Sequence, residues 1–230
     1  MKKSAPILPL DHRSRVAAER REKMRLRLLG TAMRIGAEKG PVAISIDDVI
    51  LGAEVSRGSF YKYFPSVDAL IREVATQVAN ELIQMAEPVV LGINDPAERL
   101  SCGIRLVSRI ALTQPVVAAF LVQLGWPNVH KPDILLDFAR RDLLVGIKLG
   151  RFTHMPLKLA LNIVSGAVLG AAHCLLDPST ERNFAELSAE AALRALGLPA
   201  NEAKEISTRP LLDLDLSTSA LFRGDMLQIQ

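Results

Sequence analysis

Aromatic residues are scarce in this sequence: they make up 4% of the 230 residues, with one Trp and two Tyr. Hydrophobic residues nevertheless reach 49%, so a core must be built mostly from Leu, Val, Ile and Ala, a composition that favours helices. The length suits one medium domain, or a small domain joined to a larger one.

Cysteine is also rare. The two cysteines, Cys102 and Cys174, lie far apart, and no apolar signal segment begins the chain. These features predict a reduced, cytoplasmic setting without a disulfide framework.

The usual sequence patterns of enzymes are missing as well. The four histidines show no metal-ligand spacing, and His173 and Cys174 diverge by about 100 degrees on a helix, so they form no acid-base pair. The sequence has no phosphate-cradling Gly loop and no nucleophile elbow. We therefore expect a protein that is not an enzyme and that needs no cofactor and no metal.

Residues 159–176 form an uncharged run of 18 residues, which is long enough to suggest a membrane span. Small and polar residues interrupt the run, and no aromatic belt flanks it. We expect instead a helix that is buried on nearly all sides, and no membrane partner. The interrupting residues are Asn162, Ser165, Gly166, Gly170 and His173.

Charge is distributed unevenly along the chain. Residues 1–65 contain 13 Lys/Arg against 7 Asp/Glu, whereas residues 66–230 contain 15 against 18. A basic N-terminal end favours a polyanionic partner, although a merely solvated helix would show the same composition. The basic cluster consists of Arg13, Arg15, Arg20, Arg21, Lys23, Arg25 and Arg27.

Apolar residues recur with helical period along nearly the whole chain, with Gly, Pro and Asx residues between the periodic stretches. This pattern predicts an all-α fold. The expected helices cover residues 14–39, 45–53, 56–64, 66–88, 95–112, 116–125, 133–150, 156–176, 182–196 and, as one or two turns, 201–207. Alternating Leu and Asp at 212–216 suggest an extended tail, because no partner strand is visible.

Residues 45–64 have the spacing of a helix-turn-helix. Ser45 is placed to cap one helix with Asp48 at its N3 position, and barely three residues after that helix Ser56 can cap another. Two helices this close in sequence must meet at a sharp turn. The alternative is a corner of a helical bundle that binds no DNA.

The second of these helices meets the requirements of a helix for the DNA major groove. Val55, Phe60 and Phe64 can face the core, and Gly58 allows a close backbone approach. Four side chains that can donate hydrogen bonds face outward. They are Arg57, Ser59, Tyr61 and Lys62, and we refer to them as the recognition face.

The segments 46–50, 53–64 and 65–70 resemble the DNA-binding signature of the TetR family of bacterial regulators, and the resemblance covers roughly residues 25–72. It implies a homodimer, a palindromic double-stranded operator, usually repression, and release by a small-molecule effector. It also implies phosphate contacts by Ser45 and Tyr61, base contacts by Arg57 and Ser59, and backbone or base contacts by Lys62 and Tyr63. The full set of expected DNA-binding residues is Ser45, Ser56, Arg57, Gly58, Ser59, Tyr61, Lys62 and Tyr63.

Two residues depart from the family pattern. Glu54 replaces the usual glycine of the turn, so a side chain must tolerate a left-handed or nearby backbone conformation. Val67 replaces a common lysine, which removes one contact to phosphate.

A two-fold operator requires a protein surface that pairs with itself. We expect that surface on residues 156–176 and the following helix, because small residues four apart allow close helix contact. Both helices could instead be core within one subunit. The candidate interface residues are Gly166, Ala167, Leu169, Gly170, Phe184, Leu187 and Ala191.

An aliphatic chamber with few aromatics would suit a small lipophilic effector, with Arg105 or Arg109 at its polar end. The candidate lining residues are Met85, Cys102, Arg105, Arg109, Phe120, Trp126, His130, Phe138 and His173.

These observations divide the chain into four parts: a basic N-terminal arm (1–23), a helix-turn-helix DNA-binding domain (24–68), a ligand-binding and dimerisation domain (69–197) and a C-terminal tail (198–230). The function they indicate is that of a sequence-specific DNA-binding transcriptional regulator, expected to be a repressor. The alternative is a helical adaptor that binds another protein through the tail, or, further off, an enzyme.

Overall fold

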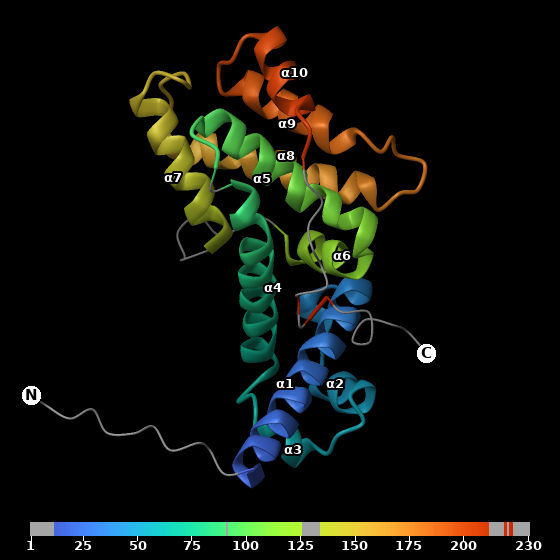
Figure 1. Ribbon diagram of the computed structural model, residues 1–230. Helices are drawn as coiled ribbons and strands as arrows, with labels where there is room; N and C mark the ends of the chain where they lie inside the picture. Colours follow the sequence, from blue (N-terminus) through green and yellow to red (C-terminus); the bar gives the residue numbers. More distant parts are fainter. Residues whose placement is uncertain (1–11, 91, 126–133, 212–218, 220, 223–230) are drawn as a thin grey trace, which may run out of the picture.

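The structure is a computed structural model that describes residues 12–90, 92–125, 134–211, 219, 221 and 222. Within these residues every regular element is a helix, which confirms the all-α prediction. The molecule is elongated, with α1–α3 at one end and α5 and α7–α10 at the other (Figure 1). The long helix α4 (Val67–Val90) runs from the first end to the second.

The helices follow the predicted boundaries within about two residues. At the N-terminal end they are α1 (His12–Lys39), the short 3-10 helix η1 (Pro41–Ala43), α2 (Ile46–Gly52) and α3 (Arg57–Tyr61). The rest are α5 (Pro96–Thr113), α6 (Pro115–Leu124), α7 (Ile134–Lys148), α8 (Leu157–Leu175), α9 (Phe184–Ala195) and α10 (Ala200–Thr208). Because α10 is a complete helix, the one or two turns expected at 201–207 are confirmed.

Two boundaries differ from the prediction for local reasons. The helix expected to stop at Pro88 continues to Val90, since a proline in the last turn removes only one N–H from a ladder that is about to end. The helix expected over 56–64 ends earlier, at Tyr61, because turn-like hydrogen bonds from Tyr63 and Phe64 to the carbonyl of Phe60 follow it.

Two apolar cores stabilise the molecule. The junction core, as we call the first, joins α1–α4 to α6 and to the ends of α5, α8 and α9, and it also contains Leu221 and Phe222. The C-terminal core lies among α5, α7, α8, α9 and α10. The N-terminal end, α1–α3, is therefore held to the rest of the chain by continuous packing rather than by a linker.

Helices α1 and α6 come closest at Gly36. A Cβ atom at this position would lie 2.8 Å from the ring of Phe120, closer than such contacts allow, so only glycine fits without a shift. Phe120 is fully buried in this contact. The absence of a side chain at Gly36 thus lets α1 approach α6 closely.

Helix α8 contains the apolar run at 159–176. By length and composition it is the one described helix that would be able to cross a membrane, and a third of its apolar window is buried within the chain. The expectation of burial on nearly all sides is therefore wrong for the single chain. One face of α8 packs on α5 and α9, and another is open.

Candidate nucleic-acid interface

The first helix of the predicted motif, α2, is fixed by its N-terminal cap. The hydroxyl of Ser45 accepts a hydrogen bond from the backbone N–H of Asp48 (3.1 Å), and the Asp48 carboxylate accepts one from the backbone N–H of Ser45 (3.0 Å). This reciprocal capping box was predicted and is confirmed. Ser45 also donates its hydroxyl proton to Asp48 (2.7 Å), so a contact with phosphate would compete with that bond.

Asp48 is the most perturbed acid of this end. Hydrogen bonds from the Ser45 side chain and backbone, followed by that of Lys39, lower the pKa of Asp48 from 3.8 to about 2. The carboxylate therefore stays charged at any pH where the protein works, and it sits where the positive end of the α2 dipole favours it.

The second helix, α3, is only five residues long and has its own cap. The hydroxyl of Ser56 accepts the backbone N–H of Ser59 at 3.1 Å, and the two hydroxyls lie 2.9 Å apart. Phe60 and Phe64 are buried behind the helix with ring centroids 6.2 Å apart. The aromatic pair clamps α3 to the junction core.

The opposite side of α3 faces solvent. Arg57, Tyr61 and Lys62 are exposed, and Ser59 is half-buried. Within the described part of the chain, an added Cβ at Gly58 would meet only the Ser56 hydroxyl, at 4.0 Å, so the helix is not crowded from outside by these residues. The predicted division of inward and outward side chains is confirmed, and the recognition face is free to approach another molecule.

Of the other side chains expected to contact DNA, Ser45 and Ser56 are exposed and Tyr63 is not. Tyr63 is half-buried against the junction core, and Val67 packs there as well. Because Val67 buries apolar surface at the start of α4, its place in this sequence has a packing reason that a lysine would not supply.

The turn between α2 and α3 has the conformation that the missing glycine implied. Glu54 has a φ of 50°. Among the described residues, it is the only one other than glycine with a positive φ. Arg27 on α1 donates to the Glu54 carboxylate at 2.7 Å. This ion pair offsets a negative charge that would otherwise stand beside the recognition face.

A second acid also lies beside that face. Asp47 accepts a hydrogen bond from the guanidinium of Arg57 at 2.5 Å, and both side chains are exposed. Because each guanidinium has five donors, Arg57 keeps several for another partner while Asp47 holds it in place. Sequence reasoning missed this pairing, since it joins two helices across the turn.

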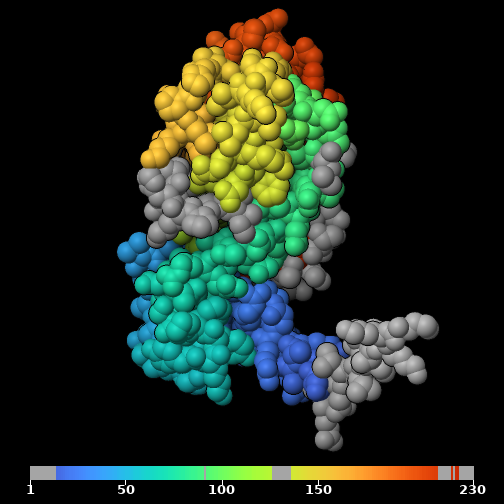
Figure 2. All heavy atoms as spheres, turned by 90° about the vertical axis from the view of Figure 1, so that its left-hand side faces the viewer, coloured from blue at the N-terminus to red at the C-terminus, as the bar shows by residue number. Residues whose placement is uncertain are grey.

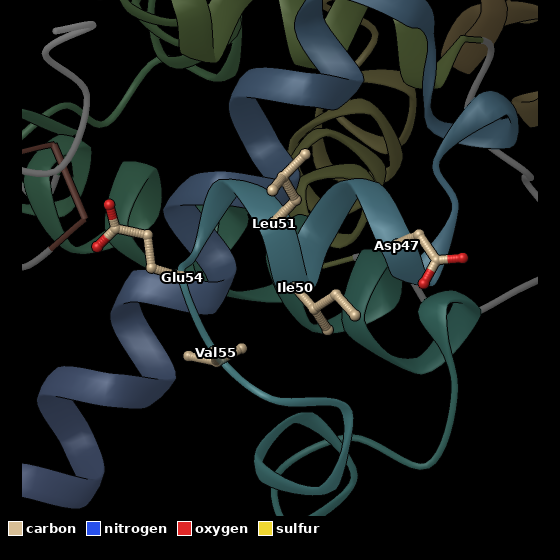
Figure 3. Close-up of a pocket in the computed structure, with 5 residues that line it drawn as sticks. All are labelled: Asp47, Ile50, Leu51, Glu54 and Val55. Atoms are coloured by element: carbon tan, nitrogen blue, oxygen red, sulfur yellow. The ribbon is translucent and has the colours of Figure 1, made fainter.

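Five residues of this region line an open hollow on the surface of α2, of about 670 Å³ (Figure 3). Asp47 and Glu54 mark its two ends, with Ile50 and Leu51 between them. Leu51 is 80% exposed. The remaining lining residue is Val55.

The start of α1 adds positive charge at the same end of the molecule. Its first turns project beyond the body of the protein at the level of α3 in both views (Figures 1 and 2). Arg20, Arg21 and Lys23 are exposed, and no ion pair involves them within the described part of the chain. Arg15 pairs with Glu19 at 3.8 Å.

Several of the described residues expected to line an effector chamber already have partners within the chain. Arg105 is buried and donates to Glu186 at 3.2 Å, and Arg109 also binds Glu186. Phe120 packs on Gly36, and His173 is exposed on α8. The two arginines therefore join α5 to α9 rather than lying free at the polar end of a chamber.

The other described chamber candidates lie on α4, α5 and α7. Met85 and Cys102 are buried, and burial raises the pKa of the Cys102 thiol. Phe138 lies under the guanidinium of Arg141, 5.1 Å from the ring centre. Trp126 and His130 lie outside the described residues.

The expected interface residues on α8 and α9 share one property: all are exposed or half-buried within the chain. Leu187, Ala191 and Gly170 are exposed. The half-buried members are Gly166, Ala167, Leu169 and Phe184.

Two family models match the chain. The model described as bacterial regulatory proteins, tetR family, matches residues 28–74, and the model described as tetracyclin repressor-like, C-terminal domain, matches residues 95–209. The second match alone covers half of the chain.

Solved structures with this architecture include that of RolR in complex with resorcinol. It is 33% identical, covers 86% of this chain and 99% of its own, and has a TM-score of 0.62. A tetR-family regulator from Shewanella sp. PV-4 shares the fold at 17% identity, with a TM-score of 0.66 over 76% of this chain and 99% of its own.

Curated relatives agree over shorter spans. An HTH-type transcriptional regulator of Mycobacterium tuberculosis is 26% identical over 60% of this chain and 66% of its own length. EthR of the same species is 38% identical over 24% of this chain and 26% of its own. With capped helices α2 and α3 exposing a polar face, and both family models matched in order, the chain belongs to the TetR family and is a DNA-binding transcriptional regulator.

Proposed function

We propose that the protein is a cytoplasmic repressor that binds a palindromic operator as a homodimer and leaves it when a small molecule binds the C-terminal domain. The observation that carries the proposal is the exposed recognition face of α3, clamped from behind by Phe60 and Phe64. Binding, rather than catalysis, is the activity proposed.

In this proposal α3 enters the major groove. Arg57 bonds a guanine through its O6 and N7 atoms, while Tyr61 and Lys62 contact phosphates or neighbouring bases. Asp47 acts as a positioning residue, because its hydrogen bond limits the rotamers of Arg57 before DNA arrives. An arginine held this way loses less side-chain entropy on binding.

The exposed turns at the start of α1 supply sequence-independent affinity. Arg20 and Lys23 have no described ion-pair partner, and the start of α1, which contains them, lies at the same end of the molecule as α3 (Figure 1). Contacts between these cations and phosphates would release counterions and make binding depend on salt. They would also make up for the phosphate contact that Val67 removes.

A second copy of the chain is proposed to cover the open faces of α8 and α9. A helix as apolar as α8 with only a third of its window buried leaves apolar surface that a monomer would expose to water. Leu159 is 50% exposed on α8 and Leu187 is 44% exposed on α9. Small residues at 166, 167 and 170 allow a partner helix to approach closely.

The effector proposed is a small, largely apolar molecule with hydroxyl groups, similar to resorcinol, which is the ligand in the RolR complex. Support comes from the 33% identity to that protein across nearly its whole length. Arg105 and Arg109 already share Glu186, so the polar groups of the effector would need other partners.

One experiment tests the DNA-binding proposal directly. The full chain is used to select bound fragments from random DNA, and light scattering measures its mass in solution. A two-fold symmetric sequence bound by a dimer is the expected result, with resorcinol as the first compound tested for release. Recovery of unrelated fragments, or a monomer at micromolar concentration, would contradict the proposal.

A further inference from the structure

Ser219, Leu221 and Phe222 follow the last described helix, α10, by at least ten residues, yet all three are buried. Leu221 and Phe222 are buried almost completely in the junction core, together with side chains of α1, α4 and α6. In Figure 1 the short red segment lies between α4 and the upper part of α1. The segment is therefore an internal part of the core, although it follows the last helix.

A single carboxylate receives this segment. Glu81 on α4 is 5% exposed, and its Oε2 atom accepts hydrogen bonds from the Ser219 hydroxyl and from the backbone N–H of Leu221 (3.2 Å). Its other oxygen accepts one from Gln77 at 2.7 Å. The Ser219 hydroxyl in turn accepts the backbone N–H of Phe222 at 2.7 Å.

Glu81 is a buried acid on a face of α4 that is otherwise apolar. It shares this side of the helix with Val78, Leu82 and Met85, where an acid without partners would be strongly destabilising. Among the described residues, the tail supplies two of the hydrogen bonds that compensate for its burial, and Gln77 supplies a third. The acid and the segment 219–222 thus form a matched pair.

The polar contacts continue from Glu81 to the DNA-binding end. Gln77 accepts a hydrogen bond from Arg25 on α1 at 3.2 Å, and Arg25 also donates to Glu73 at 2.8 Å. Hydrogen bonding with Glu22, opposed by partial burial, raises the pKa of Arg25, so this cation stays charged. One connected set of side chains therefore joins the tail, α4 and α1.

We infer that Ser219, Leu221 and Phe222 form a latch that docks onto Glu81 of α4 and holds α4 against α1, thereby fixing the orientation of the DNA-binding end. Neither family model includes residue 81 or any residue after 209, so the latch belongs to this chain rather than to the matched family domains. The effect of the latch on operator binding rests on the function proposed above. The docking of the latch onto Glu81 does not depend on that function.

The test uses the full chain and amide hydrogen exchange, which needs no DNA. Three variants weaken the latch: Glu81→Gln, Ser219→Ala, and the double change Leu221→Ala with Phe222→Ala. Glu87→Gln changes an exposed acid on the same helix, and Leu198→Ala removes buried apolar atoms from the C-terminal core. These two are the controls for charge and for general loss of stability.

The latch predicts that exchange speeds up by about tenfold or more in α4 near residues 77–85 and in the facing part of α1, with α10 little changed. Ser219→Ala is the mildest variant and remains informative if the others fail to fold. Equal acceleration throughout the chain, as expected for Leu198→Ala, would overturn the latch, and so would unchanged exchange in α4.

Operator affinity of the same variants tests the second half of the inference. A severalfold loss of affinity, with helix content and mass unchanged, is expected for the latch variants and not for Glu87→Gln. Selective exchange in α4 with unchanged operator affinity would support docking and overturn the link to DNA. Failure of the wild-type chain to bind any selected operator would instead contradict the proposed function.

Discussion

The two ends of the molecule use their charged residues in different ways. Beside the recognition face, the ion pair of Arg57 and Asp47 is exposed and joins residues ten apart in sequence. In the C-terminal domain, the pair of Arg105 and Glu186 is buried and joins residues 81 apart. The exposed pair leaves the polar face of α3 open to solvent, whereas the buried pair joins α5 to α9.

This difference shows which kind of binding site can be predicted from a sequence. A surface that binds DNA is built from caps, turns and exposed donors, which a short segment specifies by itself. A chamber for a small molecule depends on how separate helices pack, and Arg105 shows that an isolated arginine in the sequence can be a packing element.

The largest expected effect comes from the contact that joins the two ends. Phe120→Ala should lower the free energy of unfolding by about 3–5 kcal/mol, because a fully buried ring is lost beside α1. Gly36→Ala alone should cost about 1–3 kcal/mol, since its Cβ presses on that ring. Denaturant unfolding measures both.

The double variant sharpens that test. In the absence of the Phe120 ring the added methyl of Gly36→Ala has space, so the two changes together should cost less than the sum of the single changes. Strict additivity would mean that the two residues do not share the contact described above.

Next in size is the loss of base recognition in Arg57→Ala. Discrimination should fall by about 1–3 kcal/mol for each half-site, with helicity and dimerisation intact, because the guanidinium is exposed and bonds an exposed acid rather than packing in the core. Gel-shift titrations against the selected operator and against random DNA measure the ratio. Lys204→Ala, which changes an exposed cation on α10, is the matched control and should bind like the wild type.

Removing the positioning acid should have a smaller effect in the same assay. Asp47→Asn keeps the size of the side chain but weakens its hold on Arg57, so discrimination should fall less than in Arg57→Ala while affinity for random DNA holds or rises. A variant that discriminates as poorly as Arg57→Ala would show that Asp47 does more than position the arginine.

The start of α1 should affect salt dependence rather than recognition. Arg20→Ala combined with Lys23→Ala removes up to four phosphate contacts per dimer, so the slope of log affinity against log salt should become less steep by about 3–4. The preference for operator over random DNA should stay the same. An unchanged slope would mean that Arg20 and Lys23 do not contact phosphates and belong to a solvated helix face.

The smallest effect expected is on pH dependence. The pKa of Asp48 is lowered from 3.8 to about 2 in the folded chain, so the stability it contributes is present above about pH 4 and is lost as pH falls toward 2. Circular dichroism between pH 5 and 2 should show this loss in the wild type. In Asp48→Asn the same contribution should be absent at every pH.

Much of this architecture could be predicted because its signals are local. Helix ends follow Gly, Pro and capping residues, and the positive φ of Glu54 follows from a glycine position that holds another residue. The Arg57–Asp47 pair and the sharing of Glu186 by two arginines could not, because each depends on the angle between helices.

The tail shows the same limit. Its alternating Leu and Asp residues at 212–216 lie outside the described residues, so the predicted extended conformation stays a prediction. Burial of Leu221 and Phe222 could not be anticipated, since the acid that receives them is 138 residues away from Ser219 on α4. The signal in the sequence that could have pointed to this contact is Glu81, an acid on an otherwise apolar face of α4.

Methylation interference on the selected operator tests the central claim most directly, because guanine N7 is open only in the major groove. With the wild-type chain, methylation of one guanine in each half-site should abolish binding, and with Arg57→Ala those two positions should lose their influence. If the same guanines mattered equally for both chains, or if none mattered, α3 would not be the element that recognises the operator.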